Sequence, residues 1–107
     1  IISNGKELCI LLVKDFLTAT KGIDYSRELF WQAPTKQLIP VAEVIVNSDG
    51  VLLIADDTLQ LPALTLLSVH NDLVQISQSL PIFLRTATKP QLHFYGYHLQ
   101  NNQLIIR

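Results

Sequence analysis

The three histidines are the residues best suited to chemistry, because an imidazole can bind a metal ion or move a proton near neutral pH. They are His70, His93 and His98. His93 and His98 are five residues apart in one predicted strand, so their side chains should point to opposite faces of the sheet. His70 belongs to a predicted helix and has no cysteine or carboxylate at zinc-ligand spacing. We therefore predict no metal site and no bound cofactor.

Nucleophilic catalysis is not indicated either. Ser68, His70 and Asp72 are close in sequence, but positions i, i+2 and i+4 of a helix do not converge into a catalytic triad. Cys9 is the single cysteine, lies on the apolar side of the first predicted helix and has no histidine near it in sequence. It is expected to be a buried, unreactive thiol. We predict no catalytic residues and no enzyme activity.

Four carboxylates, Glu43, Asp49, Asp56 and Asp57, could in principle hold Mg²⁺. Asp49 is explained by a turn, and Asp56 with Asp57 by the start of a following helix, where negative charge is favourable. The hairpin around these residues is similar to the opening hairpin of Nudix hydrolases, whose activity needs several glutamates on the next helix. Glu43 is the last glutamate of the chain, so the sequence excludes that reaction.

Composition indicates one folded domain over residues 1–107. The chain is 49% hydrophobic and 16% charged, which excludes intrinsic disorder. A net charge of −1 gives no electrostatic attraction to a nucleic acid backbone. The longest apolar runs, Leu8–Val13 and Leu61–Val69, are far shorter than the ~20 residues of a membrane-spanning helix. A single cysteine favours a cytoplasmic location.

The N-terminal part, residues 1–40, is expected to be helical. Asn4 and Glu7 have the spacing of a capping box, apolar residues recur at helical intervals over 5–20, and Gly22 suits a left-handed cap after the helix. The run Leu8–Val13 could instead be a buried strand. Residues 24–31 could form a second, short helix, and the prolines at 34 and 40 should prevent regular structure before the sheet.

Residues 41–107 predict a sheet crossed by one helix. Residues 41–46 and 51–55 read as strands joined by the tight turn NSDG, and the second strand, apolar throughout, should be buried on both faces. Residues 62–80 have helical periodicity and start with a proline suited to a first turn. Three strands should follow, over 82–86, 91–99 and 103–107, with Asn101-Asn102 as a turn that sets Leu99 opposite Leu104 and Tyr97 opposite Ile106. No internal repeat is evident.

The predicted order is helix–strand–strand–helix–strand–strand–strand, an α+β fold with a single five-stranded, mainly antiparallel sheet and helices on its faces. The segments AEVIVNSDGVLLIA, LPALTLLSVHNDLVQISQ and QLHFYGYHLQNNQLIIR, in this order, resemble the Roadblock/LC7 group of profilin-like domains. The resemblance covers about two-thirds of the chain. It departs from the family in the long 23–40 segment and in having no helix after the last strand.

The resemblance implies a non-enzymatic platform that pairs with itself or a homologous subunit and docks a small GTPase, a motor subunit or another signalling protein. The interface candidates are His93, Tyr95 and Tyr97 on one face of a strand, and Phe83 in an apolar edge strand. Aromatic and imidazole rings suit a surface that is exposed to water in the free protein and buried in a complex. The alternative is a sensory domain of the PAS or Cache kind, with His93, Tyr95 and Tyr97 lining a small-ligand pocket. Gly96 within this strand suggests a bulge.

Overall fold

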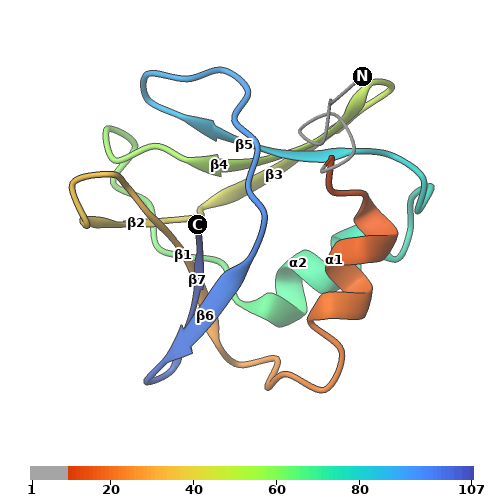
Figure 1. Ribbon diagram of the computed structural model, residues 1–107, viewed down its shortest axis with the longest axis horizontal. Helices are drawn as coiled ribbons and strands as arrows, with labels where there is room; N and C mark the ends of the chain where they lie inside the picture. Colours follow the sequence, from red (N-terminus) through yellow and green to blue (C-terminus); the bar gives the residue numbers. More distant parts are fainter. Residues whose placement is uncertain (1–9) are drawn as a thin grey trace, which may run out of the picture.

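The computed structural model describes residues 10–107, which form two helices and seven strands (Figure 1). The predicted single five-stranded sheet is wrong, because the strands form two sheets, ordered β2-β1-β7-β6 and β3-β4-β5. The elements in chain order are α1 (Val13–Ala19), β1 (Glu28–Gln32), β2 (Leu38–Pro40), β3 (Glu43–Asn47), β4 (Gly50–Ala55), α2 (Leu66–Leu73), β5 (Ile82–Thr86), β6 (Tyr97–Gln100) and β7 (Gln103–Ile106).

The two strands β1 and β2 occupy the segment that was predicted to be helical or irregular. The sequence of β1 is ELFWQ, in which Leu29 is fully buried. Its aromatic and aliphatic residues fit a pleated, half-buried surface, so β1 forms a strand between β2 and β7. Pro34 falls in the turn between β1 and β2, and Pro40 is the last residue of β2, where prolines are tolerated.

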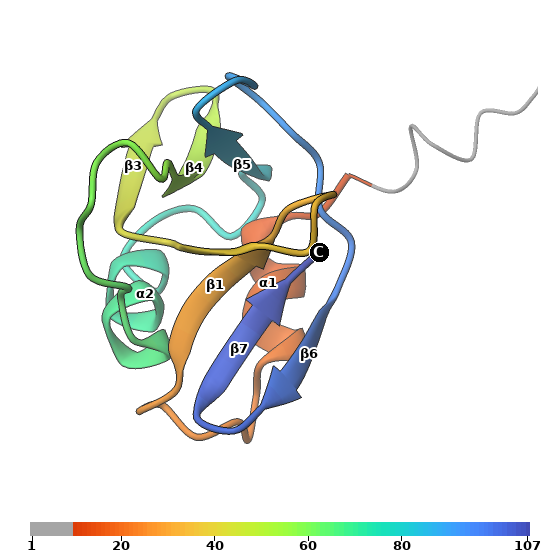
Figure 2. The same ribbon diagram turned by 90° about the vertical axis from the view of Figure 1, so that its left-hand side faces the viewer.

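Each sheet contains one parallel pair, β1 with β7 and β4 with β5, beside antiparallel hairpins. The chain over 38–47 bends from the first sheet into the second, and 91–100 bends back, with residues 91–93 antiparallel to β5 through the bridge Leu84–Leu92. The strand pairings therefore form a closed circuit around one core. Figure 2 shows β1, β7 and β6 as neighbouring strands with α1 behind them.

Both helices are shorter than predicted. Leu12 is extended and makes an isolated bridge to Pro81, so α1 begins only at Val13. Residues 10–12 belong to no helix and no strand, so the strand alternative for this run is not confirmed in its described part. The proposed capping residues Asn4 and Glu7, and Cys9, lie outside the described residues. Gly22 has φ +85°, as a left-handed cap requires, although it follows the helix end by three residues.

The second helix starts at Thr65, whose hydroxyl accepts a hydrogen bond from the Ser68 N–H. Residues 62–64 and 74–80 of the predicted 62–80 helix are outside α2. Three predictions for the sheet are confirmed: β4 is buried on both faces, β5 spans 82–86, and the last hairpin has the expected register with Asn101 at φ +53°. The predicted strand over 91–99 is wrong in its first part, because β6 covers only Tyr97–Gln100. No helix of residues 10–107 has the length and apolarity needed to cross a membrane.

An internal repeat maps residues 11–54 onto residues 64–107 with a shift of 53, although none was expected from the sequence. The shift takes the start of α1 at Val13 to the start of α2 at Leu66. It takes the parallel register Leu29–Leu104 to Ile82–Val51. We call residues 11–54 repeat 1 and residues 64–107 repeat 2. Each repeat runs helix, strand, bent strand, strand.

Six backbone hydrogen bonds between the two repeats form three pairs related by the same shift, as in a two-fold symmetric dimer. These bonds tie the first turn of each helix to the loop before the parallel strand of the other repeat. They also tie each of those strands to a residue just before the other repeat's helix. The matched bonds are Val13 N–H to Leu80 C=O with Leu66 N–H to Arg27 C=O, Lys14 N–H to Gln78 C=O with Leu67 N–H to Tyr25 C=O, and Ile82 N–H to Leu11 C=O with Leu29 N–H to Leu64 C=O.

Candidate functional site

The face of the β3-β4-β5 sheet that points away from the main core carries a second apolar cluster. Leu52, Ile54 and Phe83 form it, and each side chain is less than a tenth exposed. Ile45 is paired with Leu52 and is 39% exposed, so it extends the cluster toward the edge strand β3. We call Ile45, Leu52, Ile54, Phe83 and His93 the outer patch.

A row of rings continues the outer patch. The Phe83 and His93 rings meet edge to face at a centroid distance of 5.3 Å, and His93 stacks on Tyr95 at 6.2 Å with an interplanar angle of 12°. Tyr95 is 59% exposed, the largest exposure among the large hydrophobic residues of the described chain. Three of the four predicted interface residues therefore lie side by side on one surface.

A groove of about 270 Å³ opens on the outer patch. Its floor contains Leu52 and Phe83, and its walls carry Asp49 and Arg85 with the polar side chains of Asn47 and Gln91. The Asn47 side chain accepts hydrogen bonds from the N–H groups of the next turn residues at 2.9 and 3.1 Å, which fixes the shape of that wall. An apolar floor with a polar rim is the usual anatomy of a protein interface.

The fourth candidate, Tyr97, turns to the other side of the sheet. The N–H groups of Tyr95 and Gly96 both donate to the Arg107 carbonyl, so two residues face one, as in the bulge predicted at Gly96. The bulge ends the alternation that would have kept Tyr97 beside Tyr95. The Tyr97 hydroxyl instead donates to the Ala19 carbonyl at the end of α1, a group with no partner within the helix.

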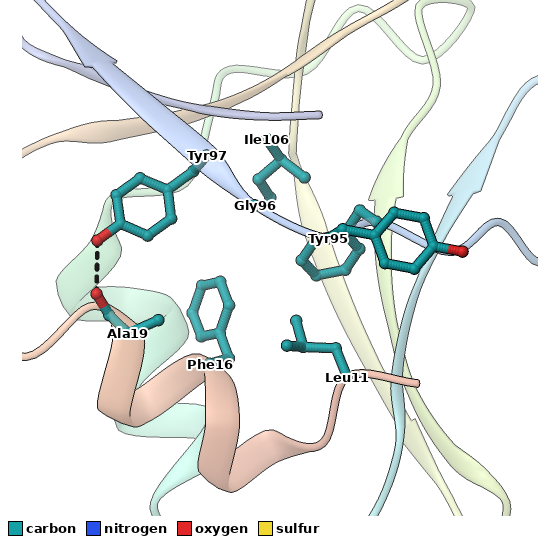
Figure 3. Close-up of a pocket in the computed structure, with 8 residues that line it drawn as sticks. Leu11, Phe16, Ala19, Tyr95, Gly96, Tyr97 and Ile106 are labelled. Carbon is teal, nitrogen blue, oxygen red and sulfur yellow. Dashed lines mark hydrogen bonds between the residues drawn. The ribbon is translucent and has the colours of Figure 1, made fainter. Parts of the chain in front are cut away.

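An apolar pocket of about 230 Å³ lies between α1 and the bulge (Figure 3). The rings of Phe16 and Tyr97 flank it, and Phe16 also meets Phe94 edge to face at 6.4 Å. The complete lining is Leu11, Phe16, Ala19, Phe94, Tyr95, Gly96, Tyr97 and Ile106. Sequence analysis missed Leu11, Phe16 and Ala19, because their role depends on a helix packing against a bulge far along the chain.

The groups considered for catalysis are dispersed. His70 packs against Tyr25 at a centroid distance of 4.9 Å, with its Nε2 atom 3.4 Å from the tyrosine hydroxyl, and not against Ser68 or Asp72. Within residues 10–107, no group of three or more histidine, cysteine, aspartate or glutamate side chains is placed to hold a metal ion.

Hydrogen bonds in local turns lower the pKa values of two aspartates. Hydrogen bonds from the Ser26 N–H and hydroxyl lower the pKa of Asp24, and hydrogen bonds from the Thr58 hydroxyl and N–H lower the pKa of Asp56. Both carboxylates are at the surface, and each bonds the residue two positions later, as structural turns do. Their pKa shifts are explained by the fold and do not indicate an acid or base for catalysis.

Comparison with known proteins gives no match: no family model, no curated protein and no solved structure matches this chain. The outer patch, the groove and the pocket are therefore the features of the described residues that bear on function.

Proposed function

We propose that this domain is a protein-interaction module without catalytic activity of its own, and that the outer patch is its docking surface. The observation that carries the proposal is the continuity of the Phe83–His93–Tyr95 row with the groove floored by Leu52. Leu52, Ile54 and Phe83 are themselves buried, and the exposed side chains beside them are Ile45, His93 and Tyr95. Exposed aromatic and apolar side chains on one sheet face are a feature of interaction sites.

The edge strand β3 supports the same proposal. It spans Glu43–Asn47, lies at the edge of its sheet and exposes Ile45 and Val46. It contains no lysine, arginine or proline, the residues that commonly protect a sheet edge from pairing. The occupant we propose is an extended segment of a partner protein that pairs with β3 and places apolar side chains on the outer patch.

The partner is proposed to be a second copy, a homologous subunit or a signalling protein such as a small GTPase. The single cysteine supports a cytoplasmic setting for this interaction. The Roadblock/LC7 arrangement, in which two five-stranded sheets join edge to edge, is not part of this proposal because the sheet it requires is absent from the described residues.

The proposal is tested with Ile45→Glu, and Val46→Glu is the matched control. Ile45 pairs with Leu52 of the outer patch, whereas the adjacent Val46 pairs with Val51 on the other side of the sheet. A charge buried without a partner at an interface should weaken association by about a hundredfold, and the control by less than about tenfold. Light scattering measures self-association, and affinity capture from native lysate measures other partners. A monomer that recovers the same proteins with and without Ile45→Glu would disprove the proposal.

A further inference from the structure

Hydrogen bonds within the protein already occupy polar groups of Tyr97 and Gly96 that border the pocket between α1 and the bulge. The Tyr97 hydroxyl is bonded to Ala19 C=O, and the Gly96 N–H and C=O are both bonded to Arg107. In Figure 3 the Tyr95 hydroxyl points away from the space between Phe16, Leu11 and Ile106. A polar ligand would find few partners among these aromatic and aliphatic side chains to replace its hydrogen bonds to water, so the pocket favours an apolar occupant.

The internal repeat shows that this pocket is a local departure from a common framework. At the equivalent place in the other half, Val44 takes the position of Tyr97, Val69 that of Phe16, and Asp72 that of Ala19. The pockets of about 210–270 Å³ described for residues 10–107 are not lined by Val44, Val69 or Asp72. Aromatic walls and the small residues Ala19 and Gly96 thus occur together on one side only. A Cβ atom at Gly96 would meet nothing within 4 Å, so the space continues beside it.

Size then limits the ligand. The volume is about 230 Å³, below the ~300–1,000 Å³ of pockets that hold drug-sized molecules. A cavity of ~150 Å³ with a similar apolar lining is large enough to bind benzene. We propose that this pocket, lined by Phe16, Phe94 and Tyr97, binds one apolar six-membered aromatic ring, as a free small molecule, independently of the outer patch.

Toluene is the probe for this proposal. It should give saturable amide shifts at Phe16, Gly96 and Tyr97 in ¹H–¹⁵N spectra of the full chain, and at ten times its dissociation constant it should raise the folding equilibrium constant about elevenfold. Ala19→Leu adds three carbon atoms to the pocket wall while the Ala19 carbonyl remains available to Tyr97. It should weaken toluene binding by at least about tenfold.

The matched control is Thr18→Leu, which adds a similar side chain to the neighbouring exposed position of α1, outside the pocket lining. It should leave toluene affinity unchanged, and Ala19→Val provides a smaller filling substitution if Ala19→Leu does not fold. Toluene that causes no saturable shift, that shifts outer-patch residues instead, or that binds equally well to both leucine variants would overturn the proposal. The Ile45→Glu variant should bind toluene normally, so failure of the docking proposal and failure of this one are distinguishable.

Discussion

Repeat 1 and repeat 2 have the same order of helix and strands, but their side chains differ on the outer faces of the sheets. Their core positions carry residues of the same kind: Leu29 matches Ile82, and Val51 matches Leu104, all buried. Their outward positions match only in part: Phe83 corresponds to Phe30 and Leu52 to Ile105, but Ile45 of the outer patch corresponds to His98 in the other sheet. The contrast shows which positions specify the fold and which are free to specialise.

The same contrast holds for the outward neighbours. Ile54 and His93, beside the groove, correspond to Arg107 and Pro40 on the other sheet. At three of the five outer-patch positions the other sheet therefore carries a guanidinium, an imidazole or a proline, while Phe30 and Ile105 keep the apolar character of the other two. A shared core with divergent outer faces is consistent with one half keeping an interaction surface that the other half lacks.

Separating the repeats should have the largest effect of the changes that test this comparison. A break after Gln60, in the exposed loop between β4 and α2, gives fragments 1–60 and 61–107. Each fragment should be unfolded alone, because chains of about 50 residues bury too little apolar surface and because β1 pairs with β7 and β4 with β5. Mixed, they should form a folded 1:1 complex, measured by circular dichroism and sedimentation.

Each fragment mixed with itself is the control and should remain unfolded, because the side chains that pack in the shared core differ between the two repeats at most aligned positions. A fragment that folds cooperatively on its own would show that a repeat is an independent domain. That result would contradict the shared core inferred from the structure.

The repeat also explains how much of the fold could be predicted from sequence. Local pairing was predictable: NSDG and Asn101-Asn102 carry turn chemistry that any hairpin would show, and both hairpins form as expected. Partition into sheets was not. It depends on the parallel contacts of β1 with β7 and β4 with β5, which join segments distant in sequence and have no local signature.

The repeat itself was hidden because the side chains have diverged. Six of the 44 aligned pairs are identical, too few to stand out, whereas apolar character is kept at the buried positions. The identical pairs are Leu11/Leu64, Ile23/Ile76, Ser26/Ser79, Phe30/Phe83, Thr35/Thr88 and Lys36/Lys89.

The candidate site was predictable only where it depends on regular strand alternation. Strand alternation placed His93 and Tyr95 on one face, but the bulge at Gly96 removed Tyr97 from it. The second face of β4, with Leu52 and Ile54, was correctly predicted to be buried, but its place in a separate apolar cluster beside exposed rings was not predicted. Alternation gives a side chain's face only as long as the strand stays regular.

A substitution of intermediate effect is Gly50→Ala, compared with Gln103→Ala at the equivalent position of repeat 2. Gly50 has φ +151°, and a Cβ atom there would lie 2.8 Å from the Pro81 carbonyl oxygen. The variant should lose about 1–3 kcal/mol of unfolding free energy. Gln103 already carries a Cβ atom, so its replacement should cost less than about 0.5 kcal/mol. Urea unfolding measures the unfolding free energy of both variants. Equal losses of unfolding free energy would show that the close approach of Pro81 to Gly50 does not distinguish the two hairpins.

The smallest expected effect concerns a turn that the two repeats build differently. Asp24 accepts hydrogen bonds from the Ser26 N–H at 2.9 Å and its hydroxyl at 2.8 Å. Ser77, at the equivalent place, accepts from the Ser79 N–H at 3.4 Å and shares a hydroxyl contact of 2.9 Å. The geometry is common to both, but only the aspartate turn carries a charge.

The charge gives the Asp24 turn a pH dependence that the Ser77 turn lacks. Its hydrogen bonds lower the pKa of Asp24 below the ordinary 3.8, so the folded state binds this proton less readily than the unfolded chain does. The stabilisation is thus present above pH 3.8 and is lost as the pH falls through the folded-state pKa.

Asp24→Ser copies the other repeat, so the difference in unfolding free energy from wild type should be small and constant at about pH 6 and shrink toward about pH 2.5. Asp56 is present in both the wild type and the variant, so its lowered pKa contributes equally to each. Its contribution therefore cancels in the difference between the two urea midpoints. A difference that stays the same across this range would mean that the Asp24 turn forms equally well with a protonated carboxyl, and that the two repeats do not differ electrostatically at this turn.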